Sequence, residues 1–417
     1  MLINRRMAPL VIRNKKIRIE VDSNKEGFSA IIGNYGSKIK FNRDDIPAMK
    51  RLGFPLALSL LLSCSQQPLP LTEGTSHLKV PQGFKIALFA DHVPRARTMA
   101  LGPDGTIYVG SQDEGVVYAV QDQDGDGVAE SQRVLLKGLD EPNGVAVVDD
   151  GLFVAEIARV TRFGPLSQPG FEKNPATMVY QDLPHETHHA YKIIKKGPDG
   201  SLYLAIGVPC NVCEPEDPRY GTIIKLHPDG TQPQRLARGI RNSMGLDWDP
   251  ETKDLWFTDN GRDGLGDNIP PDELNHLNQL GLDYGFPHCF GKEFLDPDLG
   301  QPNDCQQSTP PAFEFKAHVA PLGLHFYQGQ SFPKGFNHQL FIAQHGSWNR
   351  TQPSGYQVTT VTFDGNRNPV SEMPLVTGWL GPHGEIYGRP VDFLELSDGS
   401  LLISDDKAGV IYRLSAE

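Results

Sequence analysis

One short unit recurs six times along the chain, and this repeat constrains the fold more than any other feature of the sequence. Each copy is a tight polar turn, usually containing Asp-Gly, followed by a strand in which apolar residues alternate. A turn joined to such alternation is the signature of a β-hairpin. The copies begin at Gly102, Val148, Gly197, Asp249, Asn337 and Leu396. They are spaced by about 46, 49, 52, 88 and 59 residues.

Repeats of about 40–50 residues with several strands each are typical of β-propeller blades. We therefore predict an all-β, six-bladed β-propeller over residues 79–417. Two stacked β-sandwiches also show regular turns, but they do not predict the same unit six times. The long fourth interval requires an insertion, and residues 264–315, rich in Pro, Asp, Asn and Gly, supply it. Only residues 270–280 are expected to be helical.

A short segment near the N-terminus has the order of a bacterial secretion signal. Residues 49–51 open a basic stretch, residues 52–62 are apolar, and Cys64 follows a serine. The apolar run is too short to span a bilayer, and a cysteine after a small residue resembles a lipobox. We therefore expect residues 49–64 to be a lipoprotein signal that anchors a periplasmic protein through Cys64. The serine after Cys64 favours the outer membrane, and an ordinary apolar helix is the alternative.

This signal divides the chain into parts with different expected roles. Residues 1–48 precede Met49, which we take as the true start, so we expect them to be an extension from a wrongly chosen start codon. Residues 65–78 are expected to link the membrane anchor to the propeller.

The formal net charge of the whole chain is −12 at pH 7. Basic residues are concentrated in the first 64 positions, so the remainder is more acidic than the total indicates. Because an acidic body repels phosphate backbones, we expect no nucleic-acid partner.

The cysteines fit an oxidising compartment. If Cys64 is lipidated, four of the five cysteines remain, and this even number suggests two disulfides with three possible connectivities. Pairing Cys210 with Cys213 and Cys289 with Cys305 is the simplest of these. A zinc site is the alternative, although the spacing of the second pair does not suit a zinc ribbon. The sequence has no Cys-x-x-Cys-His, so it offers no attachment site for c-type haem.

The segment His185-Glu186-Thr187-His188-His189 formally matches the HExxH motif of zinc hydrolases. That motif binds zinc only when a helix places both histidines on one face. A proline precedes the segment and a strand with the repeat turn follows it, so we expect no helix and disfavour zinc hydrolysis. His189 beside the propeller axis suits a general base better, and a histidine satisfied at a strand end is the alternative.

Three further segments carry polar groups suited to a cofactor or a cation. Arg241-Asn242 lead into the fourth blade, where an inter-blade salt bridge is the alternative for the arginine. Residues 259–275 offer dense carboxylate and amide oxygens to calcium, or form a solvated surface loop. Residues 122–127 imitate the start of a calcium loop, but Arg133 stands where the bidentate glutamate is needed. We expect a hairpin turn there, with calcium binding as the alternative.

Together these segments resemble the soluble pyrroloquinoline quinone (PQQ) glucose and sorbosone dehydrogenase family, and in order and spacing they look closest to the sorbosone branch. The resemblance spans roughly residues 78–415, and its most specific part combines RN-x-x-G with DELN and YGFP. It implies a propeller that oxidises a sugar, a sorbosone-like aldehyde or a related alcohol by hydride transfer to PQQ, with calcium. The matching segments are HHAYKIIKKGPDGSLYLAIG from His188, GIRNSMGLDWDP from Gly239, DNGRDGLGDNIPPDELN from Asp259, GLDYGFP from Gly281 and FIAQHGSWNRTQPSGY from Phe341.

Carried over residue by residue, the resemblance implies roles for the residues of a site. His189 falls on the catalytic base, and Arg241 and Asn242 match a pair that contacts the quinone oxygens. The main-chain carbonyls that hold the cofactor's calcium fall on Gly261 and Arg262. Arg262 replaces a proline of the glucose branch, a change that need not abolish metal binding because the ligand is backbone.

The resemblance extends to residues further along the chain. Glu273 matches an acidic residue of a structural calcium region. A cationic residue from the fifth blade is expected against the cofactor carboxylates, and we predict Arg350, with Trp348 as a stacking surface. In the last blade Arg389 matches one of two family arginines. Tyr387 occupies the place of the other, which leaves the affinity for the cofactor open.

The implied chemistry explains why such residues are needed. PQQ is a planar quinone with three carboxylates, so its binding calls for arginines with bidentate geometry. Calcium polarises the carbonyl that accepts hydride, and a neutral imidazole takes the proton of the substrate hydroxyl near pH 7. Electrons then pass to an external acceptor, a quinone or a separate cytochrome.

Two other functions remain open on the sequence alone. A calcium-dependent lactonase on a six-bladed propeller needs a central metal held by carboxylate and amide side chains and no quinone. The arginines at 241, 350 and 389 argue against it. A non-catalytic propeller that binds a partner or a glycan is the other alternative. The substrate itself remains open, because substrate contacts lie on variable loops.

Overall fold

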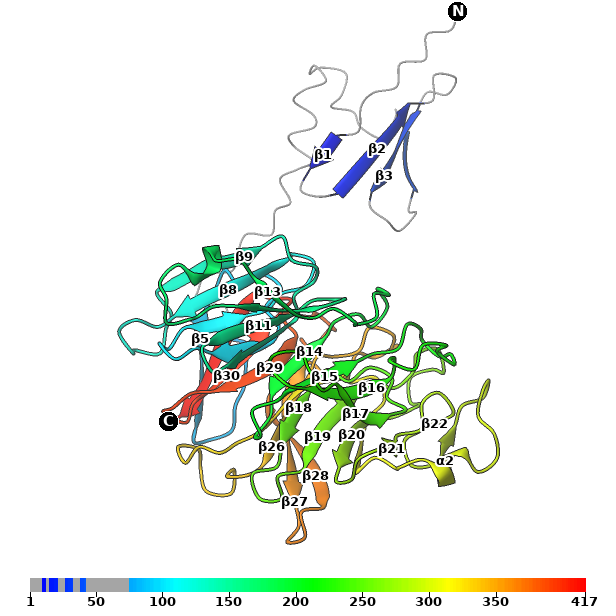
Figure 1. Cartoon of the computed structure of the whole chain (residues 1–417). Helices are drawn as coiled ribbons and strands as arrows, with labels where there is room; N and C mark the ends of the chain where they lie inside the picture. Colours follow the sequence, from blue (N-terminus) through cyan, green and yellow to red (C-terminus); the bar gives the residue numbers. More distant parts are fainter. Residues whose placement is uncertain (1–9, 13–14, 22–26, 33–37, 43–74) are drawn as a thin grey trace, which may run out of the picture. The chain divides into compact units, whose positions relative to one another are not determined.

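The computed structural model describes residues 10–12, 15–21, 27–32, 38–42 and 75–417 (Figure 1). The chain divides into two units, Met1–Leu69 and Pro70–Glu417. In the first unit the described residues form an antiparallel sheet in chain order. Its strands are β1 (Leu10–Ile12), β2 (Lys15–Val21), β3 (Gly27–Ile32) and β4 (Lys38–Asn42).

The expected lipoprotein signal at 49–64, with its anchor Cys64, lies outside the described residues, as does most of the expected linker. These assignments, and the origin of residues 1–48, stay predictions. Among the described residues, no helix has the length and apolar character needed to cross a membrane.

The second unit contains six β-sheets that form the blades of a propeller, as the repeat predicts. In each of them the strands follow one another as antiparallel neighbours, and one short strand extends blade 3 in parallel. The first three blades are β6 (Met99–Leu101), β7 (Ile107–Val109), β8 (Val116–Gln121) and β9 (Ser131–Lys137); β10 (Gly144–Val148), β11 (Gly151–Ala155), β12 (Val160–Phe163) and β13 (Thr177–Tyr180); and β14 (Ile193–Lys196), β15 (Leu202–Ile206), β16 (Thr222–Leu226), β17 (Gln234–Arg238) and β21 (Leu282–Asp283). The last three are β18 (Leu246–Trp248), β19 (Leu255–Asp259), β20 (Asp272–Leu277) and β24 (Phe313–Phe315); β25 (Pro321–Phe326), β26 (Leu340–Gln344), β27 (Gln357–Phe363) and β28 (Pro369–Val376); and β29 (Pro390–Glu395), β30 (Leu401–Asp405), β31 (Val410–Ala416) and β5 (Phe84–Ala90).

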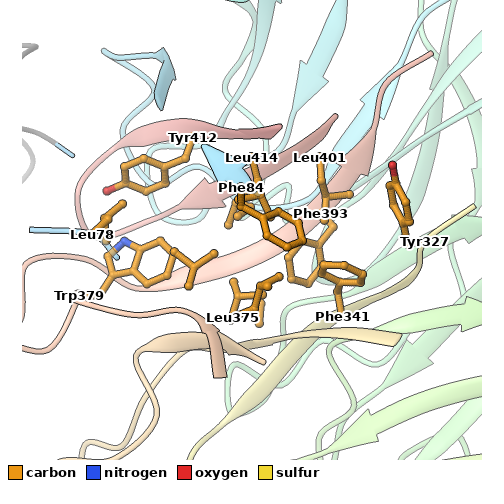
Figure 2. Packing of buried hydrophobic residues seen from close by; sticks show 14 of the residues in the cluster. Leu78, Phe84, Tyr327, Phe341, Leu375, Trp379, Phe393, Leu401, Tyr412 and Leu414 are labelled. Carbon is orange, nitrogen blue, oxygen red and sulfur yellow. The ribbon is translucent and has the colours of Figure 1, made fainter. Parts of the chain in front are cut away.

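The first strands of the blades lie next to one another in a closed ring. Their contacts run from β6 to β10, β14, β18, β25 and β29, and β29 returns to β6. Blade 6 joins the two ends of the propeller, because β5 pairs antiparallel with β31 from Phe84 with Ala416 to Ala90 with Ile411. Figure 2 shows the apolar cluster under this closure, in which Phe84, Trp379 and Leu414 are buried.

The six repeat turns each join the first two strands of a blade. At three of them an aspartate Oδ1 accepts the backbone N–H of a Thr or Ser two residues later, at distances of 2.8–3.1 Å. The glycine between those residues has φ between 78° and 84°, a conformation that side chains with a Cβ rarely adopt. The Asp-Gly-Thr/Ser pattern therefore encodes the turn locally. These turns are Asp104-Gly105-Thr106, Asp199-Gly200-Ser201 and Asp398-Gly399-Ser400.

Two details of the fourth blade differ from expectation. The segment 270–280 is not a helix, because Asp272–Leu277 form β20, which pairs with β19 on one side and β24 on the other. Pairing on both edges outweighs the helical propensity of this polar sequence. The insertion within blade 4 is correspondingly shorter than 264–315, since it begins after β20 and ends before β24. It contains β21, β22 (Cys289–Phe290), β23 (Phe294–Leu295) and α2 (Asp304–Gln307).

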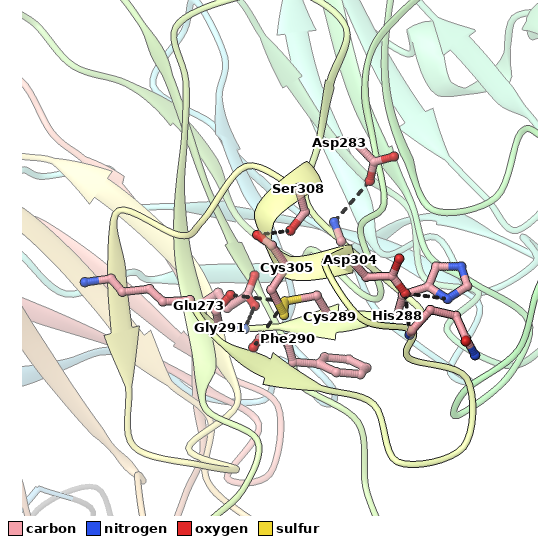
Figure 3. The surroundings of a disulfide bond; sticks show 12 residues. Glu273, Asp283, His288, Cys289, Phe290, Gly291, Asp304, Cys305 and Ser308 are labelled. Carbon is pink, nitrogen blue, oxygen red and sulfur yellow. Dashed lines mark hydrogen bonds and ion pairs between the residues drawn. A yellow bond between two sulfur atoms is a disulfide. The ribbon is translucent and has the colours of Figure 1, made fainter.

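The four cysteines of the propeller form the two local disulfides that the simplest pairing predicts. Cys210 bonds to Cys213 in the loop after β15. Cys289 bonds to Cys305 and ties β22 to α2 within the insertion (Figure 3). The expected hairpin turn at 122–127 is also confirmed, because it connects β8 to β9.

Candidate functional site

A cavity of about 340 Å³ lies at the end of the propeller axis from which the first strands of the blades start. Most of its lining residues directly precede a first strand or directly follow a second one, so the ring brings together segments far apart in the sequence. Of the nine residues predicted for the site, five contribute to the lining: His189, Arg241, Asn242, Gly261 and Trp348.

His189 lies in the turn before β14, and the HExxH segment is not helical, as expected. Its Nδ1 is 3.0 Å from the carbonyl oxygen of Val208, which can only accept. The neutral ring therefore carries its proton on Nδ1, and Nε2 is left as an acceptor. Burial and the neighbouring charge of Arg241 lower the pKa of His189 to about 2. The imidazole is neutral near pH 7, the form that a general base requires.

Arg241 is buried in the wall of the cavity, with 3% of its surface exposed. Its Nε donates to the carbonyl of Asn211 at 2.8 Å, and its Nη2 donates to Asn211 Oδ1 at 2.8 Å and to Asp263 at 3.2 Å. Its Nη1 donates to the carbonyl of Asn260 at 3.1 Å. The carboxylate of Asp259 accepts the backbone N–H groups of Arg241 and Asn242. The arginine is therefore held in the wall of the cavity, where it forms a salt bridge with Asp263 of its own blade and hydrogen bonds with Asn211 of blade 3.

Several residues of this wall were missed by sequence reasoning. Asp263 accepts from Arg241 and, at 2.6 Å, from the amide of Asn349. Asn211 lies between the two cysteines of the first disulfide, where no motif points to it. Asp263 belongs to the polar segment 259–275 that was considered for calcium. The sequence therefore singled out its carboxylate but not its contact with Arg241.

A second arginine reaches the cavity from the first blade. Arg97 is 2% exposed and donates to Asp406 at 2.9 Å and to Asn143 at 2.6 Å. His345 lies beside it and contacts the same carboxylate at 2.9 Å. Arg97 and Asp406 are separated by 309 positions, so only the closed ring brings them together. No pattern in the sequence singles out Arg97.

The residues predicted to hold calcium divide into two groups. Gly261 lies in the lining, beside Asn260, whose Oδ1 is buried without a hydrogen-bond partner among the described residues. Arg262 follows Gly261, and its side chain pairs with Asp296 and Asp298, which leaves the prediction for its main-chain carbonyl untested. Glu273 does not line the cavity. Its carboxylate accepts from the backbone of Gly291 at 2.6 Å and from Asn275 at 3.0 Å, next to the second disulfide (Figure 3).

Three buried carboxyl groups lie on β19 and β20 close to these residues. Burial raises the pKa of Asp259 to about 6, of Asp272 to about 7 and of Glu273 to about 8. Asp272 lines the cavity and accepts the N–H groups of Gly261 and Ala320 at 2.8 Å. Carboxylate, amide and main-chain oxygens in this arrangement are the ligands that calcium prefers.

Of the three cofactor residues predicted in blades 5 and 6, one lines the cavity and two do not. Trp348 lines the cavity with 76% of its surface exposed, which suits a stacking surface. Arg350 lies outside the lining and donates to the carbonyls of Ala317 and Gln352. Arg389 also lies outside it and donates to the carbonyls of His345 and Gly346, so it supports the loop that carries His345.

The acidic hairpin at 122–130 is a separate feature of blade 1. Oxygens of its four acidic residues lie within 4.8 Å of one another. All four carboxylates already accept backbone N–H groups of the same loop. The four residues are Asp122, Asp124, Asp126 and Glu130.

Residues 78–378 match the model of a family described as TrAA12-like. An uncharacterized protein of Borreliella burgdorferi is 34% identical over 365 residues, which cover 83% of this chain and 92% of that protein. A pyrroloquinoline quinone-dependent pyranose dehydrogenase of Coprinopsis cinerea is 21% identical over 422 residues, covering 85% of this chain and 56% of the enzyme.

A solved structure shows the same fold. The calcium structure of a Trichoderma reesei enzyme of carbohydrate-active family AA12 superposes with a TM-score of 0.70 at 18% identity. The superposition covers 82% of this chain and 97% of the fungal one. The family model extends over well more than half of the chain, and the Borreliella relative exceeds 30% identity along most of its length. The chain therefore belongs to the TrAA12-like family.

Proposed function

We propose that this protein is a PQQ- and calcium-dependent dehydrogenase that oxidises a sugar, a sorbosone-like aldehyde or a related alcohol. One observation carries the proposal. A neutral imidazole and a buried guanidinium lie together in the wall of one cavity, in a chain whose family relatives include a PQQ-dependent pyranose dehydrogenase. The sorbosone branch remains the finer part of this proposal, together with the choice of sugar.

The lining fits a flat polyanion accompanied by a cation. Two buried guanidinium groups offer positive charge, Arg241 to the quinone oxygens and Arg97 to a carboxylate, and the exposed ring of Trp348 offers a stacking face. The buried Oδ1 of Asn260 has no partner among the described residues and would satisfy a ligand's donor or a cation. The volume of about 340 Å³ lies within the ordinary range of small-molecule sites.

We assign the cofactor's contacts to residues that reach the cavity. Arg241 and Asn242 would meet the quinone oxygens and Arg97 a carboxylate, with Trp348 stacked on the ring system. Arg389 would act through the loop of His345, and Arg350 would need to reorient to make a direct contact.

Calcium would be held at the main-chain carbonyls of Gly261 and Arg262, with Asn260 and Asp272 as nearby oxygen donors. Glu273 would belong to a structural calcium region. The calcium structure of the Trichoderma enzyme supports a cation in this family's fold.

The reaction places separate demands on these residues. PQQ would supply the carbonyl that takes up hydride, and calcium held beside it would make that carbonyl more electrophilic. His189 Nε2 would take the proton of the substrate hydroxyl, since Nδ1 is fixed as a donor to Val208. Arg241, held on three sides, would keep its charge at a fixed position throughout. The electrons would then pass to an external acceptor, a quinone or a cytochrome. We also propose that the protein is periplasmic and anchored to the membrane by a lipid at Cys64.

The test is reconstitution of the purified protein with PQQ and calcium, followed by dye reduction with aldoses, sorbosone and simple alcohols. We expect saturable turnover that depends on both additions. His189→Ala should lower kcat by about 10²–10⁴-fold, the usual contribution of a general base. A protein that neither binds PQQ nor turns over any of these substrates would overturn the proposal.

A calcium-dependent lactonase is the second candidate, because carboxylate and amide side chains do gather in the lining. Asp263, Asp272 and Asn260 offer the side-chain oxygens that such a metal centre needs. Lactone hydrolysis that requires calcium and is unaffected by PQQ would favour it. A protein inactive in both assays would point to a binding propeller.

A further inference from the structure

We propose that Asn211 is a positioning residue that fixes the guanidinium of Arg241, and that the Cys210–Cys213 disulfide holds Asn211 in place for this role. The inference rests on the proposed function, in which Arg241 contacts the cofactor. It concerns the loop at residues 207–213, which follows β15 and is called the disulfide loop below.

Asn211 makes four hydrogen bonds to two residues of the cavity wall. Its carbonyl and its Oδ1 accept from Nε and Nη2 of Arg241, both at 2.8 Å. The same Oδ1 accepts the backbone N–H of Asp263 at 2.8 Å, and its Nδ2 donates to the carbonyl of Asp263 at 3.0 Å. Because the amide both accepts and donates, it fixes Arg241 and its acidic partner relative to each other.

The hydrogen bonds of Arg241 show how much depends on Asn211. A guanidinium has five N–H donors, and four of them bond to described residues. Two of the four go to Asn211. On this count one N–H, on Nη1, is left for a ligand in the cavity. Asn211 therefore helps to decide which edge of the guanidinium faces the cofactor.

The disulfide loop also holds the predicted base. The carbonyl of Val208 accepts from Nδ1 of His189, and its N–H donates to the carbonyl of Arg241 at 2.9 Å. Gly207 packs so closely that an added Cβ would lie 2.8 Å from the Cβ of His189. The disulfide loop thus contacts both the proposed base, His189, and the proposed cofactor contact, Arg241.

The disulfide explains how an irregular loop can hold a fixed geometry. Cys210 and Cys213 are three positions apart, so their bond closes a small ring with Asn211 inside it. The loop has no strand partners over residues 209–213, and a covalent closure limits the conformations of such a segment. Cys210 and Val212 also pack against an apolar cluster that contains Phe286 and Phe290.

The experiment compares Asn211→Ala with Asn211→Asp in the full chain. Alanine removes the three side-chain hydrogen bonds, whereas aspartate keeps both acceptor contacts to Oδ1 and places an oxygen, in place of the donor Nδ2, against the carbonyl of Asp263. We expect kcat to fall about tenfold or more in Asn211→Ala, with a smaller change in KM for the sugar. Asn211→Asp should recover much of that loss. Asn174→Ala, on an exposed loop with one amide contact to Gln168, is the matched control.

A second measurement does not require activity. Phenylglyoxal modifies accessible arginines, and mass spectrometry of the cofactor-free protein gives the rate at Arg241. Arg241 is 3% exposed, so this rate should be low in the wild type and several-fold higher in Asn211→Ala. The double variant Cys210→Ser/Cys213→Ser should raise it in the same direction. Cys289→Ser/Cys305→Ser, which removes the other disulfide, should not.

The outcomes separate the two proposals. If a folded Asn211→Ala protein, checked by circular dichroism, has wild-type kcat and wild-type modification at Arg241, the positioning role is overturned. If the wild type itself shows no PQQ-dependent turnover, the proposed function fails, and the modification rates alone decide whether Asn211 holds Arg241.

Discussion

At the closure of the propeller, β5 pairs along β31 and covers a cluster of buried apolar side chains that includes Phe84, Trp379 and Leu414 (Figure 2). At the wall of the cavity, the buried side chains are instead charged or polar, among them Arg97, Arg241 and Asp272. The closure gains free energy from apolar burial. The cavity wall carries the cost of removing charges from water, which hydrogen bonds offset.

This difference teaches where each region's residues are needed. Apolar packing at the closure stabilises the fold and does not depend on a bound ligand. A buried carboxyl group with a raised pKa, such as Asp272, and an amide oxygen without a partner among the described residues, such as that of Asn260, are costly, and such groups gather at functional sites. Changes at the closure should therefore alter stability more than activity, and changes at the wall should do the reverse.

The largest expected effect on stability is at the closure. Phe84 is 2% exposed and packs edge-on against Phe332 and Phe336, with ring centroids 4.9 and 4.8 Å away. Phe84→Ala should lower the free energy of unfolding by about 3–5 kcal/mol, because it leaves a cavity in a packed core. Denaturant unfolding measures this, with Met373→Ala at a half-exposed site as the control. A large fall in kcat of the folded variant would contradict the comparison.

The second prediction concerns acid stability at the cavity wall. The pKa of His189 is lowered to about 2 from its ordinary 6.5, so between these values the unfolded chain binds a proton that the folded chain does not. The free energy of unfolding should fall as pH drops below about 6.5, by at most about 1.4 kcal/mol per pH unit from this group. Thermal unfolding from pH 7 to 4 should show a shallower fall in His189→Gln. Equal slopes would mean that the histidine titrates normally in the folded protein.

The third prediction concerns His325, which lies between blades and away from the cavity lining and whose contribution to stability should be lost at high pH rather than at low pH. His325 on β25 contacts Asp247 at 3.1 Å and Glu395 at 2.8 Å, and despite the opposing effect of burial these carboxylates raise its pKa to about 9. Its contribution is complete below pH 6.5 and is lost as pH rises through about 9. His325→Gln should remove this alkaline loss of stability. A wild type as stable at pH 10 as at pH 6.5 would argue against a charged His325.

The smallest effect is expected at the acidic hairpin of blade 1. Asp124 is exposed and accepts one backbone N–H within its own loop, at 3.1 Å. Asp124→Asn should change the free energy of unfolding by less than about 0.5 kcal/mol and leave turnover unaltered. A loss of calcium-dependent stability in this variant would show that the hairpin binds calcium.

Much of the candidate site could be predicted because its residues lie in segments that resemble the PQQ glucose and sorbosone dehydrogenase family, and that resemblance implied their roles. His189, Arg241, Asn242 and Gly261 each lie close to the start or end of a blade's inner strands, and the ring brings them to one end of the axis. Arg350 and Arg389 were harder to place. Their positions depend on loop conformations, and loop backbones are not specified by strand periodicity.

The sequence by itself left the connectivity of the four propeller cysteines open, but it determined the number of blades and the hairpin at the start of each blade. These depend on interactions over a few residues, such as an aspartate accepting the N–H two positions later. Only the tertiary structure decided that Asp272–Leu277 are a strand, that Arg97 reaches the cavity beside Asp406, and that Asn211 holds Arg241. Each of these needs partners outside the segment itself: neighbouring strands of the same blade for Asp272–Leu277, the adjacent blade for Asn211, and the closed ring for Arg97 and Asp406.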